Sequence, residues 1–118
     1  MKAGVLVFSI VAAAAWLVLA WITWQAGTQS GWAAVNDAFN AGLTQPWPAQ
    51  FQVDLMINLF LFAPWIAWRS SSRIAGAVGA VAVLFLGSLF TIPYILLALW
   101  RSGGNVAATL IGRHYQAS

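Results

Sequence analysis

The hydrophobic positions of this chain form three long runs, and the segments between them hold most of the polar residues. The runs cover residues 3–24, 51–68 and 74–100. Each is long enough to cross the hydrocarbon core of a bilayer as a helix, which takes roughly 20 residues. Because lipid offers no partner to an unpaired backbone group, we expect three transmembrane α-helices. The third run is long and contains Pro93, so it is expected to tilt or bend.

The segment between the first two runs contains turn residues, in AGTQSGW and TQPWPAQ. Within it, Trp32, Val35, Phe39 and Leu43 recur at spacings of three and four. This pattern predicts a short amphipathic helix over residues 32–43, lying on the membrane surface. A Gly-Gly pair opens the last segment, residues 101–118, which is expected to be a polar tail. The predicted fold is a single all-α membrane domain, residues 1–118: a small bundle of three helices with an interfacial helix between helices 1 and 2.

Composition supports lipid as the solvent of this chain. Of its 118 residues, 62% are hydrophobic and 6% are charged, whereas a soluble domain carries about 25% charged residues. The 8 tryptophans gather toward the ends of the runs, as in the aromatic belts of membrane proteins. The first run could also serve as a secretory signal, but Trp21 and Trp24 lie where a cleavage region should be small and polar. We therefore interpret it as an anchor.

The basic residues predict an orientation. All five lie at the edges of the runs and not in a nucleic-acid-binding stripe, so no nucleic-acid partner is expected; they are Lys2, Arg69, Arg73, Arg101 and Arg113. Three spans would place the first three on one side and the last two on the other. The positive-inside rule then predicts a bacterial inner-membrane protein with a cytoplasmic N-terminus and a periplasmic C-terminus.

Small residues mark the helix faces expected to pack. One stripe of the third run contains Gly76, Ala80 and Gly87, together with Thr91 and Tyr94. A stripe of the first run contains Ala13 and Ala20, together with Ser9 and Trp16. Small side chains let two helix backbones approach closely in a membrane.

Asp54 and Asn58 are the polar pair within the second run, where they share a helix face with Leu61 and Trp65. We expect Asp54 in the first turn of that helix, near the outer interface, where the cost of a charge is reduced. Two interpretations stay open. The pair is either structural, bonded to Thr91, Tyr94, Ser9 or the loop, or it binds a ligand, a proton or a partner.

Prolines within the runs create a second group of candidate binding groups, which are backbone carbonyls that could help coordinate an ion or cofactor. Pro64 and Pro93 release the backbone carbonyls of Phe60 and Leu89 from helical hydrogen bonding. Trp16 lies deep in the first run, where it can pack against a helix or a flat ligand. With Trp65 and Asn58, it would form the pocket of a pigment- or quinone-binding module.

Catalytic chemistry is missing from the sequence. There is no cysteine, and the single histidine, His114, lies in the tail, so no metal site is expected. No phosphate-binding loop, nucleophile motif or pair of carboxylates within the runs is present. The sequence therefore predicts a protein that is not an enzyme. It requires no cofactor, although a pigment, quinone or lipid ligand is compatible with it.

The segments QVDLMINLFLF, WIAWR and LGSLFTIPYILLAL carry a resemblance to a known group. Over about Trp24 to Arg101, the chain resembles an uncharacterised group of short bacterial three-span membrane proteins. The resemblance implies fold and location, and it singles out Asp54, Asn58, Gly87, Pro93 and Tyr94.

Three functional hypotheses follow from these observations. The first is a non-catalytic accessory subunit of a larger energy-converting or transport complex, packed against other membrane-protein subunits. The second is a homo-oligomeric channel or carrier for a small solute or proton that uses Asp54 and Asn58. The third is the pigment- or quinone-binding module.

Overall fold

The computed structural model describes residues 2–116, and within them the chain folds into helices without any strand. The elements are α1 (Ala3–Ser30), α2 (Ala34–Leu43), α3 (Pro46–Arg69), α4 (Arg73–Leu86), α5 (Ser88–Arg101), α6 (Val106–Ile111) and the 3-10 helix η1 (Gly112–His114). The prediction of an all-α protein is confirmed. The expected loop helix is present as α2.

Two helices, α1 and α3, are long and apolar enough to cross a membrane by length and composition. Both exceed their predicted bounds. α1 continues through residues expected in the loop, and α3 begins at Pro46, where a proline loses no hydrogen bond because the first helical N–H has no partner anyway. Residues 46–53 therefore precede Asp54 in α3. The prediction that Asp54 lies in the first turn is wrong: it lies about 12 Å into the helix at ~1.5 Å per residue.

The predicted third span is not one helix. Gly87 divides it into α4 and α5, of 14 residues each, and Gly87 has φ 58° and ψ −132°, a backbone conformation that only glycine adopts without strain. Each helix is about 21 Å long, which is less than the ~30 Å of a hydrocarbon core. Two helices, and not three, therefore meet the criterion for a membrane span.

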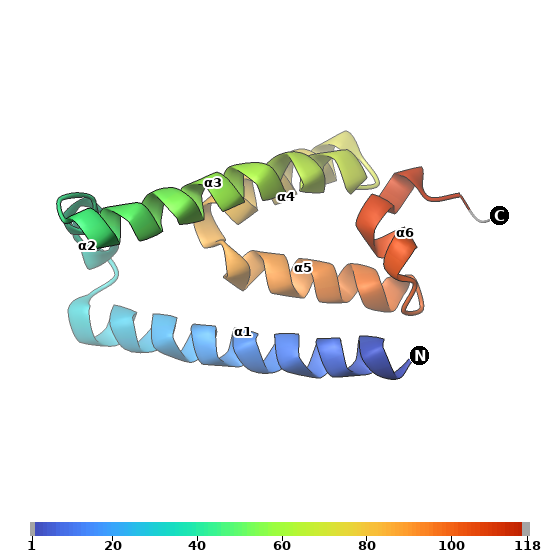
Figure 1. Ribbon diagram of the computed structural model, residues 1–118, viewed down its shortest axis with the longest axis horizontal. Coiled ribbons are helices and arrows are strands. Elements are labelled where there is room, and N and C mark those ends of the chain that lie inside the picture. The colour runs from blue at the N-terminus through green and yellow to red at the C-terminus, as the bar shows by residue number, and fades with distance from the viewer. Residues whose placement is uncertain (1, 117–118) are drawn as a thin grey trace.

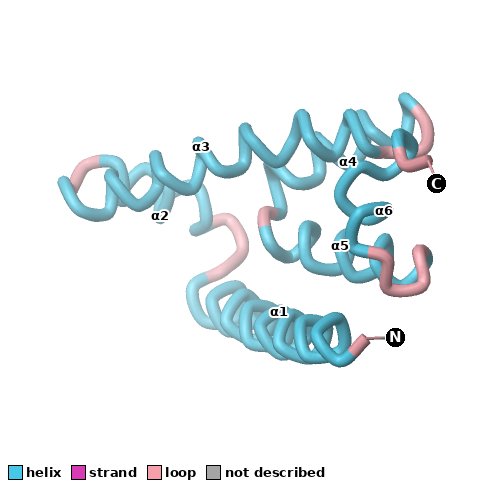
Figure 2. The backbone as a smooth tube through the Cα atoms, turned by 45° about the vertical axis from the view of Figure 1, so that its right-hand side comes forward, coloured by secondary structure: helices cyan, strands magenta, loops and turns pink. Residues whose placement is uncertain are grey.

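The break at Gly87 reverses the direction of the chain. Figure 1 shows α4 running back beside α3 and α5 returning beside α1. The view in Figure 2 shows the same arrangement from another side, with both chain ends on the right. We call α4 and α5 together the helical hairpin, with Gly87 at its tip.

The hairpin supplies much of a small core. Ile66 of α3 and Val83 of α4 are fully buried, with Ala63 beside them. Two glycines of α4 permit this close contact: a Cβ on Gly76 would lie 2.9 Å from the Ala67 carbonyl oxygen, and one on Gly79 would lie 2.7 Å from Ile66 Cγ2. Most large apolar side chains of α1 and α3 instead lie on the exterior.

The hairpin also decides where the basic residues lie. Arg69, Arg101 and Arg113 line one shared cavity, so the expected placement of Arg101 and Arg113 opposite Arg69 is wrong. Figure 1 shows the start of α1, the α3–α4 connection and the end of α5 at the same end of the molecule. We call it the basic end, because Lys2 precedes α1, Arg69 ends α3, Arg73 begins α4 and Arg101 ends α5, while Arg113 lines the same cavity as Arg69. The opposite end, which contains α2, is the α2 end.

Candidate functional site

Asp54 and Asn58 lie on the exterior of α3. The Asn58 side-chain amide donates to the Asp54 backbone carbonyl at 3.1 Å and to Asp54 Oδ1 at 3.4 Å. Both residues are exposed. The hydroxyls expected to hold them bond elsewhere, Thr91 to the Gly87 carbonyl and Ser9 to the Val5 carbonyl. Within residues 2–116, the pair has no hydrogen-bond partner on another helix, and the predicted network to Thr91, Tyr94 and Ser9 does not form.

The pair is part of a longer outward face of α3. Its members recur at spacings of four and three; they are Trp47, Phe51, Asp54, Asn58 and Leu61, and we call them the α3 seam. Its apolar members are 65% to 72% exposed. The opposite face of α3 carries Leu59, Ala63 and Ile66 into the core. A seam with this spacing is typical of helices that pack against another helix.

Trp16 bonds to the backbone of another helix. Its indole Nε1 donates to the Leu89 carbonyl at 2.9 Å, linking the middle of α1 to the start of α5. Leu89 O is the carbonyl that Pro93 leaves without a helical donor. The indole therefore satisfies a backbone group that the proline released.

The remaining predicted residues lie toward the basic end or at the hairpin tip. The Trp65 indole donates to the Leu110 carbonyl at 2.9 Å. The Tyr94 hydroxyl accepts from Arg69 at 2.7 Å and contacts the Ser70 hydroxyl at 2.8 Å. Thr91 is buried one helical turn after Gly87.

The residues of the expected flat-ligand pocket are therefore separated. Trp16 of α1 bonds to α5, Trp65 of α3 bonds to α6, and Asn58 lies on the exterior of α3. None of the three lines either of the two larger cavities. The structure does not form a ligand pocket from this trio.

Only some of the small residues that were predicted to pack against another helix do so. Gly76 is buried against α3, and Ala80 packs against the core. Gly87 forms the hairpin tip instead of a packing surface. On α1, Ala13 is exposed and Ala20 is half-buried.

The segment expected to be a polar tail is folded against α3. Arg69 Nε donates to the Thr109 carbonyl at 2.7 Å. The His114 ring stacks on Trp68 with centroids 4.2 Å apart and contacts the Trp68 carbonyl at 3.0 Å. A capping signal could have predicted α6, because Asn105 Oδ1 accepts from the Ala108 amide at 3.0 Å.

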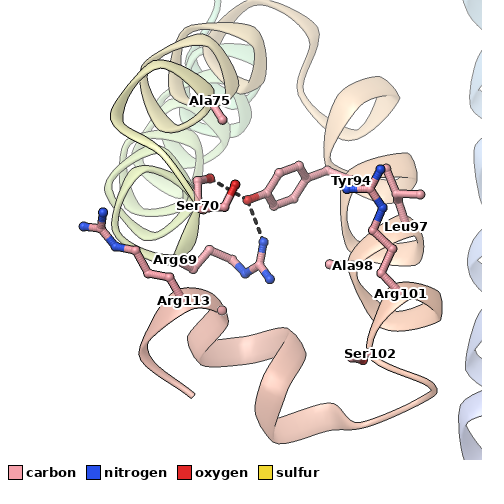
Figure 3. Close-up of a pocket in the computed structure, with 11 residues that line it drawn as sticks. Arg69, Ser70, Ala75, Tyr94, Leu97, Ala98, Arg101, Ser102 and Arg113 are labelled. Atoms are coloured by element: carbon pink, nitrogen blue, oxygen red, sulfur yellow. Dashed lines mark hydrogen bonds between the residues drawn. The ribbon is translucent and has the colours of Figure 1, made fainter. Parts of the chain in front are cut away.

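At the basic end, α3, α4, α5 and η1 line a cavity of about 400 Å³. Its charged and polar lining consists of Arg69, Ser70, Ser71, Tyr94, Arg101, Ser102 and Arg113, and we call it the arginine cavity. Figure 3 shows the Arg69 guanidinium reaching toward Tyr94, while Arg101 lines the opposite wall on α5. The Arg113 side chain extends away from Tyr94 at the rim. The sequence did not predict this site, because three spans would place Arg101 and Arg69 on opposite sides of the membrane.

A second cavity, of about 700 Å³, lies beyond the hairpin tip. It is lined mainly by apolar side chains of α1, α2 and α3, among them Leu19, Phe39 and Met56. Gln52 is also in the lining, and its side-chain oxygen is buried without a hydrogen-bond partner. Residues 2–116 hold no group of three or more His, Cys, Asp or Glu side chains placed to bind a metal.

Comparison with known proteins places the chain in a family. A family model described as "Protein of unknown function (DUF1475)" matches residues 2–107, so the chain belongs to that family. No curated protein and no solved structure matches the chain.

Proposed function

We propose that this protein is a non-catalytic accessory subunit of a larger membrane complex, which it contacts through the α3 seam. The observation that carries the proposal is the outward position of Asp54 and Asn58 on an otherwise apolar helix surface. A carboxylate facing lipid deep in a bilayer costs several kcal/mol by most estimates. Contact with a neighbouring subunit would remove that cost by supplying donors to the carboxylate.

The membrane location rests on α1 and α3, whose length and composition suit a bilayer. In this proposal they are the two membrane spans. The helical hairpin enters the membrane from the side of the basic end and leaves it on the same side. Irregular backbone at membrane depth is tolerated where protein covers it or where it lines a cavity. The Gly87 tip fits that condition, because its N–H bonds to the Val83 carbonyl at 2.9 Å and the tip borders the larger cavity.

Orientation follows from the basic end. With two spans and a hairpin, all five basic residues face one side, and the positive-inside rule makes that side cytoplasmic. Both termini are then cytoplasmic, in place of the opposite sides expected for three spans. The α2 helix would lie at the outer surface, where its exposed Val35, Phe39 and Leu43 side chains suit an interface with lipid. We place the protein in a bacterial inner membrane.

Native mass spectrometry after gentle detergent extraction tests the proposal. We expect the tagged chain to be recovered with other membrane subunits, and Asp54→Leu to lower that recovery by about tenfold, which corresponds to ~1.4 kcal/mol of binding free energy. Asp37→Leu is the matched control, because it removes the other acidic residue, which lies on α2 and outside the seam. Recovery of the chain alone, or equal recovery for both variants, would exclude the proposal.

The α3 seam also suits a second candidate, a homo-oligomeric channel or carrier in which several copies bring Asp54 and Asn58 to a shared path. Flux through vesicles containing the purified protein separates the two. Asp54→Asn and Asn58→Leu should both change flux if the pair lines a path. Equal flux for these variants and the unaltered protein would rule the channel out.

A further inference from the structure

We propose that the arginine cavity binds a phosphate group, carried either by free inorganic phosphate or by the headgroup of an anionic phospholipid. The phosphate site itself rests only on the cavity and its charges. A phospholipid as the source rests in addition on the proposed membrane location. No residue of the α3 seam lines this cavity, so the two proposals can fail separately.

Uncompensated positive charge is the first argument. Three arginines line the cavity and no acidic residue does. The chain has two acidic residues in all, Asp37 on α2 at the far end and Asp54 on the exterior of α3. Within residues 2–116, the cavity arginines therefore have no carboxylate partner. Gathering like charges is unfavourable unless an anion neutralises them, and arginine matches the geometry of phosphate oxygens through two parallel N–H donors.

Arg69 is already held in place for such a contact. Its Nε donates to the Thr109 carbonyl and one terminal nitrogen donates to the Tyr94 hydroxyl, each at 2.7 Å. Its guanidinium carbon also lies 5.2 Å from the centre of the Tyr94 ring and 5.9 Å from that of Trp65. These contacts use two of about five N–H donors of the guanidinium. The donors left over belong to a side chain whose rotamer is fixed before any ligand arrives, which lowers the entropic cost of binding.

The rest of the lining suits a phosphate in size and chemistry. The cavity volume of about 400 Å³ is in the range of small-molecule sites, roughly 300–1,000 Å³. Ser71 adds a hydroxyl from the α3–α4 connection, whereas Ser102 donates its hydroxyl to the Leu99 carbonyl at 2.8 Å. Figure 3 shows Arg69 and Arg101 on facing walls, so an anion between them would be bound from both α3 and α5.

The cavity also lies at the level expected for lipid headgroups. Trp68 and Trp100, which immediately precede Arg69 and Arg101, are 46% and 55% exposed. Tryptophan at this position relative to a cationic residue is typical of the membrane–water interface. A headgroup phosphate in the cavity would leave its acyl chains beside the exposed apolar surfaces of α4 and α5.

The test uses the purified full-length protein and two probes. In the first arm, the protein is placed in nanodiscs of phosphatidylcholine alone or of equal parts phosphatidylcholine and phosphatidylglycerol, and native mass spectrometry counts the retained lipids. In the second arm, inorganic phosphate is titrated into the phosphatidylcholine sample while tryptophan fluorescence is followed. Arg101→Gln is the test variant, because Arg101 is exposed and its side chain makes no hydrogen bond or ion pair within residues 2–116.

Arg73→Gln is the matched control, since Arg73 lies at the same end and outside the cavity lining. We expect Arg101→Gln to weaken binding by about tenfold, the loss expected for a hydrogen bond to a charged group, and Arg73→Gln to change it little. A difference between the two variants in the phosphatidylglycerol arm identifies a lipid headgroup as the source of the phosphate. The same difference in the phosphate arm identifies free phosphate as the ligand. Absence of binding in both arms overturns the proposal. Equal weakening by the two variants also overturns it, because that result indicates general charge attraction.

Discussion

At the scale of single residues, the contact between Trp16 and Leu89 explains how α1 joins the rest of the molecule. Pro93 removes the donor that the Leu89 carbonyl would have had in α5. A carbonyl left unpaired away from water is costly, and the Trp16 indole at 2.9 Å supplies the missing donor. A proline on one helix and a tryptophan on another therefore form a single structural unit.

Replacement of Trp16 by phenylalanine should destabilise the protein. The change keeps an aromatic ring and removes the N–H, so the Leu89 carbonyl loses its partner at a cost of about 1–3 kcal/mol. Thermal unfolding in detergent measures the effect. Trp21→Phe is the control, because Trp21 lies on the same helix and is 62% exposed. Equal melting temperatures for the two variants would show that the indole hydrogen bond contributes nothing.

At the scale of elements, the helical hairpin depends on one glycine. Gly87 ends α4 by donating to the Val83 carbonyl and begins α5 by accepting from the Thr91 amide at 3.0 Å. Its positive φ and extended ψ separate the two helices and turn the chain back. Gly87 and Ser88 form a Gly-Ser pair, and such pairs are a known site of helix kinks. This pair is the feature of the sequence that could have predicted the break.

Alanine at position 87 should destabilise the hairpin. A Cβ strains this backbone conformation by about 1–3 kcal/mol, and the strain favours a straighter path for α4 and α5. A lower melting temperature and a longer distance between spin labels at positions 78 and 97 are the expected results. Gly4→Ala is the control, because Gly4 is helical and a Cβ there meets nothing within 4 Å. Unchanged label distances and stability would contradict the role assigned to Gly87.

At the scale of the whole molecule, the hairpin brings the end of α5, with Arg101, to the end where α1 starts and α3 joins α4, as Figure 1 shows. Three straight spans would instead separate the C-terminal segment from the α3–α4 connection. In the proposed membrane location, the difference determines which surfaces share a compartment. It also makes the arginine cavity, since that site requires Arg69 and Arg101 at the same end.

Cysteine labelling distinguishes the two arrangements, and the chain has no cysteine of its own. Single substitutions Asn36→Cys, Ser71→Cys and Ala107→Cys place exposed thiols on α2, on the α3–α4 connection and on α6. We expect a membrane-impermeant thiol reagent to label positions 71 and 107 from the same side and position 36 from the other. Labelling of 107 together with 36 would support three spans and exclude the hairpin topology.

Much of the fold was predictable because it depends on local properties of the chain. Continuous apolar runs account for α1 and α3, and the spacing of Val35, Phe39 and Leu43 accounts for α2. The third run was equally apolar on both sides of Gly87, so hydropathy could not reveal that the chain turns there. Helix α6 was missed for a different reason: its six residues are too few for a periodic pattern, and Asn105 alone marks its start.

The candidate sites were less predictable. Asp54 and Asn58 were recognised by their polarity, but a helical projection could not show whether their face lies inside or outside the bundle. The direction of that face depends on which side of α3 packs against α4, where Gly76 and Gly79 permit the closest approach. Arg69 and Arg101 carried no signal of a shared site, because they are far apart in sequence and meet only through the hairpin.

By itself, the sequence determined that the protein is all-α, and it located α1, α2 and α3. Hydrophobicity and helix periodicity are properties of neighbouring residues, and they can be read without knowing the fold. Only the tertiary structure decided the reversal at Gly87, the outward direction of Asp54 and Asn58, and the gathering of the arginines around one cavity. These features depend on one backbone conformation and on which helix faces meet, so they exist only once the whole chain has packed.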